Sequence, residues 1–243
     1  MNNKGQILAK LSSLRLELET LRLYGKNEIE GIIPDDIIKR LNSAPVMEKE
    51  KTTKEETLDD VMAEVSACKK CELSGTRINT VFGVGNPNAD LMFIGEAPGA
   101  EEDKRAEPFV GRAGKLLTKM IEAMGLTRND IYIANILKCR PPENRNPLPA
   151  EVELCEHYLT RQIDAIRPKF ICALGAVSAK TLLKTKEPIS KLRGSFYSYH
   201  GTPLLPTFHP AYLLRNPAEK KNAWADLKLL MEKLGLPEKT GSE

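Results

Sequence analysis

The segment LMFIGEAPG, residues 91–99, shows which fold class this 243-residue chain adopts. Its first five residues form an unbroken apolar run, as in a strand buried on both faces, and GEAPG then ends the strand. Similar runs occupy residues 131–135, 170–175 and 203–208, and helical patterns occupy residues 113–124, 149–166, 176–184 and 218–234. This alternation predicts an α/β fold of three layers (α/β/α), in which helices cover both faces of a central, mostly parallel four-stranded sheet.

Conspicuous sequences follow three of the four predicted strands. The first strand runs into GEAPG (95–99), the second into NILKC (135–139) and the last into HPAY (209–212). Ligands of parallel sheets bind at the carboxyl ends of the strands. We therefore expect the functional site at this edge of the sheet.

The rest of the chain divides into three further segments. Leucines spaced three and four apart over residues 5–24 predict an amphipathic helix within a helical extension, residues 1–42. Residues 43–57 are charged and poor in apolar side chains, which is typical of a linker. The main domain is then expected at 58–237, followed by a frayed tail at 238–243.

Composition excludes several classes of protein. With 41% hydrophobic and 28% charged residues, the chain can bury a core and is not globally disordered. It has no run of about 20 apolar residues that could span a membrane and no secretory signal, so we expect a soluble, cytoplasmic protein without a membrane partner. The net charge is +3, and residues 1–57 hold equal numbers of basic and acidic side chains. The basic excess therefore lies in the main domain, where it could line a nucleic-acid groove.

Four of the five cysteines are candidate metal ligands. Cys68 and Cys71 are separated by two residues, Cys139 follows the second predicted strand, and Cys155 lies in the next helix. Four thiolates could bind a [4Fe–4S] cluster or Zn²⁺, and incidental cysteines are the alternative. Cys172 lies inside an apolar strand and is expected in the core.

Four motifs occur in a fixed order along the main domain. They are GEAPG (95–99), PFVGRAG (108–114), Asn135 followed by KCRPP (138–142), and HPAYLLRNP (209–217). Together with the cysteines they closely resemble the family-4 uracil-DNA glycosylases, the iron–sulfur branch of that superfamily, over about residues 65–230. The resemblance implies a monofunctional enzyme of base excision repair that hydrolyses the N-glycosidic bond of deoxyuridine in single- or double-stranded DNA. It also implies a [4Fe–4S] cluster on the four cysteines.

The resemblance further implies roles for residues that would meet the flipped uracil. His209 would donate a hydrogen bond to uracil O2 as negative charge develops there. Asn135 would pair with N3–H and O4, and Phe109 would stack on the ring. Glu96 would position water or stabilise the sugar cation, and the backbone N–H groups near Glu96 and Ala97 would contact the base.

Other residues are expected to exclude thymine or to contact DNA. Glu102 would block the space of a 5-methyl group, although either Glu102 or Glu96 could instead be a solvated surface charge. Leu213, Leu214 and Arg215 would probe the duplex, with an apolar wedge and a phosphate contact. Further candidate phosphate contacts are Lys104, Arg112, Lys138, Arg140 and Arg145.

The sequence leaves open the role of the cluster, the reaction and the partner of the leucine stripe. Cys139 lies four residues after Asn135, and we hypothesise that the cluster braces the segment that carries the uracil reader. The chain could instead be a non-catalytic iron–sulfur DNA-binding or polymerase-associated module, or a glycosylase for another deaminated base. A related group of glycosylases traps uracil sites covalently through a histidine in a short basic insertion between the first motif and PFVG. Residues 101–107 contain no histidine, so such a covalent trap is not expected. We expect a monomer, and the leucine stripe of residues 5–24 could dock on its own domain, on a second copy or on a protein partner.

Overall fold

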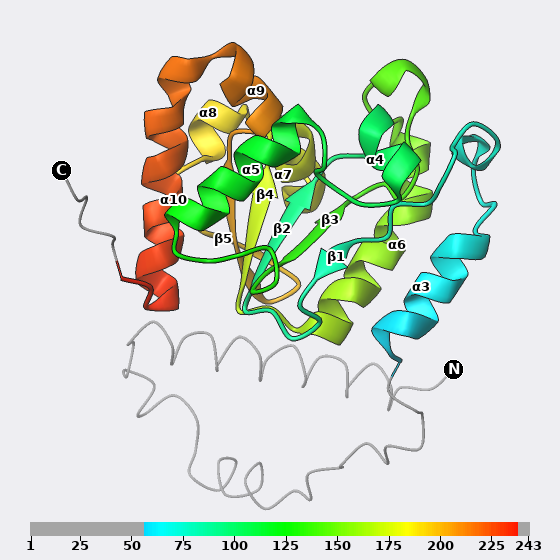
Figure 1. Cartoon of the computed structure of the whole chain (residues 1–243), viewed down its shortest axis with the longest axis horizontal. Helices are drawn as coiled ribbons and strands as arrows, with labels where there is room; N and C mark the ends of the chain where they lie inside the picture. The colour runs from blue at the N-terminus through cyan, green and yellow to red at the C-terminus, as the bar shows by residue number, and fades with distance from the viewer. Residues whose placement is uncertain (1–55, 238–243) are drawn as a thin grey trace, which may run out of the picture. The chain divides into compact units, whose positions relative to one another are not determined.

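The computed structural model describes residues 56–237. The predicted helical extension (1–42), nearly all of the predicted linker (43–57) and the tail (238–243) lie outside the described residues. Figure 1 shows the described part as a central sheet between helices.

The sheet has six strands in the order β1-β3-β2-β4-β6-β5. The four predicted strands form its parallel centre: β2 (Leu91–Gly95), β3 (Tyr132–Asn135), β4 (Phe170–Leu174) and β6 (Thr202–Thr207). Two short antiparallel strands, β1 (Val84–Gly85) and β5 (Tyr197–Tyr199), add one edge each. The predicted fold class is confirmed, and the sheet is two strands wider than predicted because the edge strands are too short to show an apolar run.

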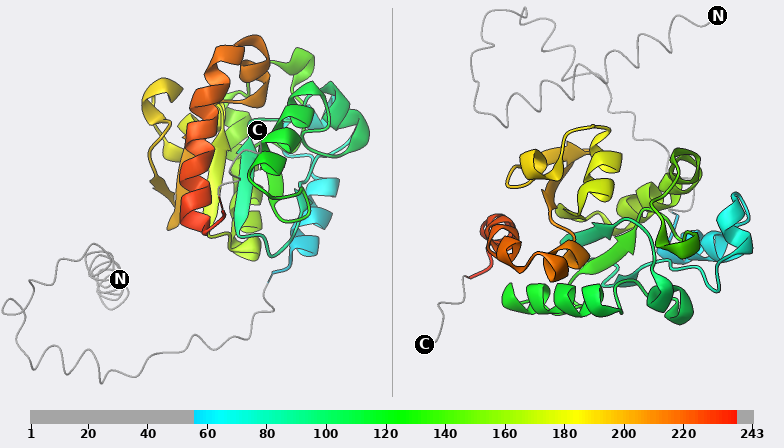
Figure 2. Two further views of the ribbon diagram at one scale, coloured as in Figure 1. Left: turned by 60° about the vertical axis from the view of Figure 1, so that its left-hand side comes forward. Right: turned by 90° about the horizontal axis from the view of Figure 1, so that it is seen from above.

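Helices cover both faces of the sheet (Figure 2). One layer contains α5 (Arg112–Ala123) and α10 (Lys220–Leu234), and the other contains α6 (Pro149–Ile166), α7 (Ala176–Leu183) and α8 (Ile189–Leu192). Shorter elements are α4 (Ala100–Arg105), α9 (Pro210–Arg215), η1 (Glu72–Gly75), η2 (Pro142–Asn144) and η3 (Pro217–Glu219). In the part of the chain that the structure describes, no helix has the length and apolarity to cross a membrane.

The continuous apolar runs arise because the sheet is buried on both sides. Met92 and Ile94 of β2 pack in the core beneath α6, α7 and α8, whereas Leu91 and Phe93 pack beneath α5 and α10. Side chains alternate between the faces of a strand, so each face of β2 must be apolar. The two cores hold the strands in place, and the side chains at the carboxyl ends of the strands are therefore held in place as well.

Helix α3 (Leu58–Ala67) packs beside α6 and ends at Cys68, the first residue of the cysteine pair. Thr57 caps the helix, because its hydroxyl accepts the Asp60 N–H and its own N–H is bonded to the Asp60 carboxylate at 2.9 Å. Arg161 of α6 then binds two carboxylates from the other side, those of Glu64 and Glu56, with contacts of 2.6–2.8 Å. These contacts hold α3 against α6, and Cys68 follows directly at the end of α3.

Candidate functional site

Asn135 is the central residue at the carboxyl edge of the sheet. It is the last residue of β3, pairs in register with Gly95 of β2, and is only 2% exposed. Among the residues that the structure describes, its side-chain Oδ1 has no hydrogen-bond partner. A buried polar atom is normally paired, since leaving it unpaired costs about 1–3 kcal/mol. The unpaired Oδ1 is therefore an acceptor to which a ligand can donate a hydrogen bond.

Phe109 lies beside Asn135, and His209 lies beside Phe109. A Cβ on Gly95 would collide with both the Asn135 Oδ1 and the Phe109 ring, so both side chains converge on this glycine. The centroid of the Phe109 ring is 5.7 Å from that of the His209 imidazole. Similarly, a Cβ on Gly175, after β4, would meet the His209 Cβ at 2.7 Å. Glycines at these two strand ends thus leave room for Asn135 and Phe109 at one end and for His209 at the next.

The loop that carries Phe109 is held in an unusual conformation. Phe109 has a φ of 55°, in the left-handed region that a bulky residue rarely adopts. The Glu102 carboxylate accepts the N–H groups of Val110 and Gly111, both at 3.0 Å. Arg128 donates from the other side, to the carbonyls of Pro108 at 2.9 Å and Phe109 at 3.3 Å. Glu102, expected to exclude thymine, therefore also holds the aromatic loop in place.

His209 is held as a neutral imidazole with its proton on Nε2. It is the N-cap of α9, and its Nδ1 accepts the N–H of Ala211 at 3.1 Å. An Nδ1 that accepts leaves the ring proton on Nε2. Burial lowers the pKa of His209 to about 4, the charge of Arg215 acts in the same direction, and Glu102 opposes both. Near neutral pH the residue is thus an uncharged Nε2–H donor.

Glu96 and Ala97 begin the loop after β2, and both are partly buried. Burial raises the pKa of the Glu96 carboxyl above its ordinary value. The Glu96 carbonyl accepts the N–H of Leu137 at 3.0 Å, so the pairing of β2 with β3 continues past the strand ends. This pairing fixes Glu96 at the same edge of the sheet as Asn135.

Helix α9 exposes only some of the residues that the sequence predicts to contact DNA. Leu213 is 1% exposed and packs against Phe208 and Ala223, so this structure does not present it to DNA as the sequence predicts. Leu214 is 43% exposed, and Arg215 is exposed as well. Pro210 and Leu213 are three residues apart and lie on the same buried face of α9, whereas Leu214 and Arg215 are exposed. Tyr212, for which the sequence predicts no DNA contact, is exposed on the same helix.

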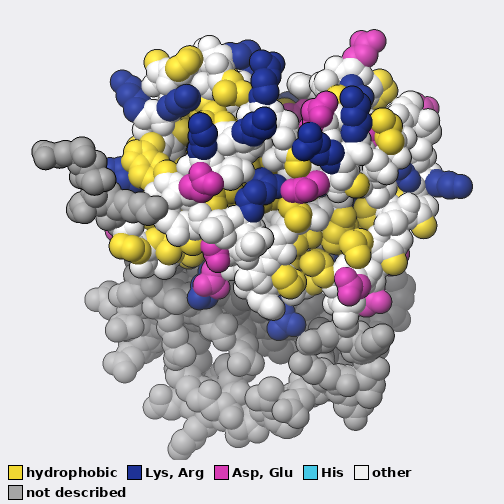
Figure 3. Space-filling view, viewed as in Figure 1, with side chains coloured by type: hydrophobic (Ala, Val, Ile, Leu, Met, Phe, Trp, Pro, Cys, Tyr) yellow, Lys and Arg dark blue, Asp and Glu magenta, His cyan; other side chains and the backbone are white. Residues whose placement is uncertain are grey.

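The basic residues named as phosphate contacts also separate into groups. Lys138 is buried, which corrects its assignment to the surface. Arg145 binds the Glu151 carboxylate with contacts of 2.5 and 2.9 Å, and Arg140 donates to Asn144. Lys104 and Arg112 remain exposed. Figure 3 shows most of the visible Lys and Arg side chains in the upper half of the molecule, where α4, α5 and α9 lie.

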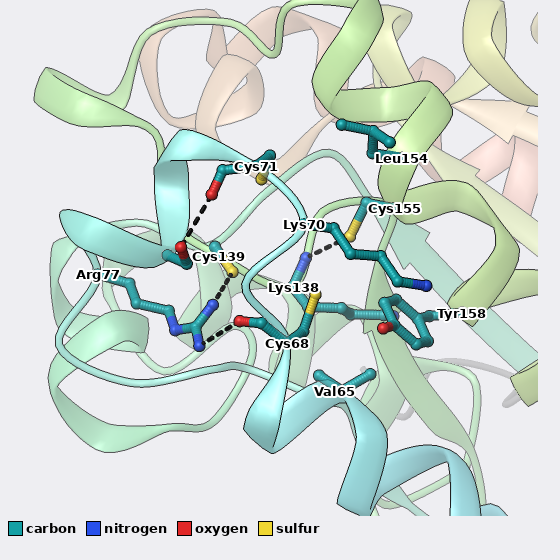
Figure 4. Close-up of a pocket in the computed structure, with 11 residues that line it drawn as sticks. Val65, Cys68, Lys70, Cys71, Arg77, Lys138, Cys139, Leu154, Cys155 and Tyr158 are labelled. Carbon is teal, nitrogen blue, oxygen red and sulfur yellow. Dashed lines mark hydrogen bonds between the residues drawn. The ribbon is translucent and has the colours of Figure 1, made fainter.

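The four candidate cysteines surround one pocket (Figure 4). Cys68 follows α3, Cys71 precedes η1, Cys139 follows β3, and Cys155 lies in α6. All four are free thiols, and the pocket walls include Val65, Leu154 and Tyr158. Cys172 is buried in β4, within the core on the α5 and α10 side.

Nitrogen donors reach two of the cysteine sulfurs. Arg77 donates to the Cys139 Sγ at 3.1 Å and to the Cys68 carbonyl at 2.8 Å, and the backbone N–H of Lys138 donates to the Cys155 Sγ at 3.4 Å. Burial raises the pKa of the Cys155 thiol to about 11. Within residues 56–237, no three Cys, His, Asp or Glu side chains are grouped closely enough to hold a single metal ion. Arg77 was missed in the sequence because nothing in its local pattern marks it.

Comparison with known proteins agrees with this arrangement. The family model for the uracil DNA glycosylase superfamily matches residues 82–228. A type-4 uracil-DNA glycosylase of Archaeoglobus fulgidus is 44% identical over 76% of this chain and 97% of its own length. The type-4 uracil-DNA glycosylase of Saccharolobus solfataricus is 47% identical over 74% of this chain and 87% of its own length. That of Thermotoga maritima is 46% identical over 68% of this chain and 86% of its own length.

The matched segment contains Gly95, Asn135 and His209, and thus the whole carboxyl edge of the sheet. The similarity to the type-4 relatives extends over most of each relative. The chain belongs to the uracil-DNA glycosylase superfamily and, within it, to the type-4 family.

Proposed function

We propose that the chain is a monofunctional glycosylase that removes uracil from DNA by hydrolysis and leaves an abasic site for base excision repair. The observation that carries the proposal is the buried, unpaired Oδ1 of Asn135 beside Phe109 and His209. The likeness to relatives named type-4 uracil-DNA glycosylases supports the same reaction. A base inside a duplex is out of reach, so the nucleotide must be flipped out of the helix to meet these side chains.

Asn135 would read the flipped base. Its Oδ1 can accept the N3–H of uracil while its amide NH₂ donates to O4. Cytosine presents the opposite pattern, with an unprotonated N3 and an amino group, and would leave the buried Asn135 amide unsatisfied. Phe109 would stack on the ring, since its side chain borders the same glycine as the amide. Discrimination against cytosine thus follows from one oriented amide.

His209 and Glu96 would act on the two charges that bond cleavage creates. As the C1′–N1 bond breaks, its electron pair moves onto uracil and the sugar becomes cationic. The Nε2–H of neutral His209 would donate to uracil O2 and stabilise the anion. Glu96 would orient the water whose hydroxyl adds to C1′ and whose remaining proton leaves to solvent. Both ends of the breaking bond are then stabilised.

Leu214 and Arg215 would contact the DNA around the flipped nucleotide. Leu214 is apolar and exposed, so it can fill the gap that the uracil leaves in the stack. Arg215 and the exposed Lys104 and Arg112 can bind phosphates without reading sequence. Such contacts suit an enzyme that scans DNA of any sequence.

The proposed activity is tested with end-labelled duplexes that contain one U:G, T:G or C:G pair. Anaerobically purified protein is expected to produce alkali-labile sites at uracil alone. Binding to the U:G duplex without any abasic site would support the non-catalytic module instead. Cleavage at a hypoxanthine pair but not at U:G would support a glycosylase for another deaminated base.

The acid side of the pH–rate profile is expected to report Glu96 and not histidine. His209, with its pKa near 4, stays neutral through the usual histidine range, so no step is expected near 6.5. The ionised Glu96 is lost as the pH falls through its pKa, which burial raises above 4.5, so the rate should fall there. Single-turnover rates between pH 4.5 and 8 measure this.

The variant Glu96→Gln serves as the comparison for that profile. It should abolish the acid limb and lower the plateau by about 100-fold. An acid limb near pH 6.5 that persists in this variant would show that His209 titrates and that the neutral-imidazole account is wrong.

We propose that the four pocket cysteines hold a [4Fe–4S] cluster. The donor set fits, because four thiols from separate segments border one pocket and N–H groups reach two of the sulfurs. Zn²⁺ is the alternative occupant of four thiolates, and the visible absorbance of an iron–sulfur cluster, which zinc lacks, distinguishes the two. A bound cluster would tie the end of α3, the end of β3 and α6 together without taking part in hydrolysis.

Arg77 is expected to protect this centre. Replacing it with glutamine removes the donor to the Cys139 Sγ, and loss of such an outer partner typically weakens metal binding about tenfold or more. The visible absorbance of the anaerobically purified variant should therefore bleach about tenfold faster with a chelator. The control is Arg105→Gln, which removes an exposed arginine paired only loosely with Glu101. Equal bleaching rates in wild type and both variants would contradict the assignment.

A further inference from the structure

Lys138 is a buried cation to which the mechanism above gives no role. It lies three residues after Asn135 and next to Cys139, and it is 1% exposed. Placing an ammonium group in a protein interior is costly unless hydrogen bonds compensate for the lost water. The position of Lys138 therefore calls for an explanation in terms of its partners.

The side chain of Lys138 bonds to the residue that would read uracil. Its Nζ donates to the backbone carbonyl of Asn135 at 2.7 Å and to the Gln162 Oε1 at 2.5 Å. Gln162 lies in the last two turns of α6, is fully buried, and donates in turn to the Phe82 carbonyl at 3.0 Å. The ammonium thus joins the end of β3 to a helix that is itself anchored.

The main chain of Lys138 bonds to the other centre. Its N–H donates to the Cys155 Sγ at 3.4 Å (Figure 4), and its carbonyl accepts the N–H of Val81 at 2.7 Å. One residue therefore contacts Asn135 through its side chain and the cysteine pocket through its backbone.

The Asn135 side chain needs such support. Its Oδ1 has no partner among the described residues, so no hydrogen bond at that atom holds the amide in its direction. The direction then depends on the backbone torsions at the end of β3 and on the packing around Gly95. The bond from the Lys138 ammonium to the Asn135 carbonyl fixes the peptide plane directly after the Asn135 Cα.

We propose that Lys138 is a positioning residue for uracil recognition, which acts through Asn135 and connects it to the cysteine pocket. This inference rests on the proposed function and deepens it. A residue that only stabilised the fold would affect activity whether or not Asn135 is present. A residue that aims the Asn135 amide should matter only when that amide is there.

A double-mutant cycle separates the two roles. Lys138→Met removes the ammonium but keeps an unbranched apolar side chain, and Asn135→Ala removes the reader. In the wild-type background, Lys138→Met should lower kcat/KM for uracil excision about 10- to 100-fold, since it leaves the buried Asn135 carbonyl without its donor. In the Asn135→Ala background the same change should cost less than about twofold.

The controls are a surface lysine and two readouts other than activity. Lys169→Met removes an exposed lysine paired with Asp90 and should leave kcat/KM unchanged. Thermal unfolding and visible absorbance show whether Lys138→Met folds and keeps its metal centre. If it does not, Gln162→Met takes its place in the cycle, because it removes the other partner of the ammonium and leaves Asn135 intact.

Each outcome decides between the alternatives. Equal losses in both backgrounds, or no loss in the wild-type background, would overturn the positioning role. Wild-type protein that does not excise uracil would instead contradict the proposed function itself. A loss confined to the background that contains Asn135 supports the inference.

Discussion

Replacing His209 with alanine is expected to lower the single-turnover rate of uracil release by about 100- to 1000-fold, the usual cost of one donor to a developing anion. The Nδ1 of His209 already accepts the Ala211 N–H, so Nε2–H is the donor available for uracil O2. A neutral donor is the form present, because burial lowers the pKa of this histidine to about 4. The matched control is His200→Ala at an exposed turn, which should keep the full rate.

A second variant separates catalysis from helix capping. His209 is the N-cap of α9, and losing a cap typically costs about 1 kcal/mol of stability. His209→Asn supplies a good N-cap but lacks a donor at the distance of Nε2. This variant should melt close to the wild-type temperature and still be slow. A His209→Asn protein with nearly full activity would contradict the assigned role.

Replacing Asn135 with aspartate is expected to change which base is removed. The carboxylate only accepts hydrogen bonds, so it faces uracil O4 unfavourably, whereas it can accept from the amino group of cytosine. Uracil excision should fall about 100-fold or more, and excision at C:G should rise above the wild-type background. The measurement compares U:G and C:G duplexes under single-turnover conditions.

The control for this change is Asn129→Asp in an exposed turn, which adds the same charge away from Asn135. It should leave both rates unchanged. An Asn135→Asp protein that removes uracil at the wild-type rate would show that Asn135 does not read the base.

The centre of the fold could be predicted because its strands are buried on both faces. The runs at 91–95 and 170–174 are apolar throughout, and both proved to be central strands. The edge strands β1 and β5 have two and three residues, which is too short for any periodic pattern to stand out. The sheet was therefore underestimated only at its edges.

The candidate site could be predicted as a set of residues but not as a set of contacts. The motif order led to Asn135, Phe109 and His209, which the structure brings together. Whether a residue faces inward depends on packing, so Lys138 and Leu213 were wrongly placed at the surface. For Leu213, helical periodicity over residues 210–215 held the missing information. For Lys138, the partner Gln162 lies 24 positions away and no local signal connects them.

The same limit applies to the cysteines. Spacing identified the pair Cys68 and Cys71, and the apolar strand set Cys172 apart. The donors around the pocket come from Arg77 and from the backbone of Lys138, which the spacing of cysteines does not predict. Arg77 is 62 positions from Cys139 and Lys138 is 17 positions from Cys155, so no local pattern connects these partners.

The most direct test of the account is the stoichiometry of the products. Anaerobically purified protein is incubated with a hundredfold excess of U:G duplex, and free uracil and abasic sites are counted separately. The account predicts many uracils released per protein molecule and one abasic site for each uracil. No free uracil, or a single uracil per protein with the DNA retained on it, would contradict a hydrolytic, turning-over glycosylase.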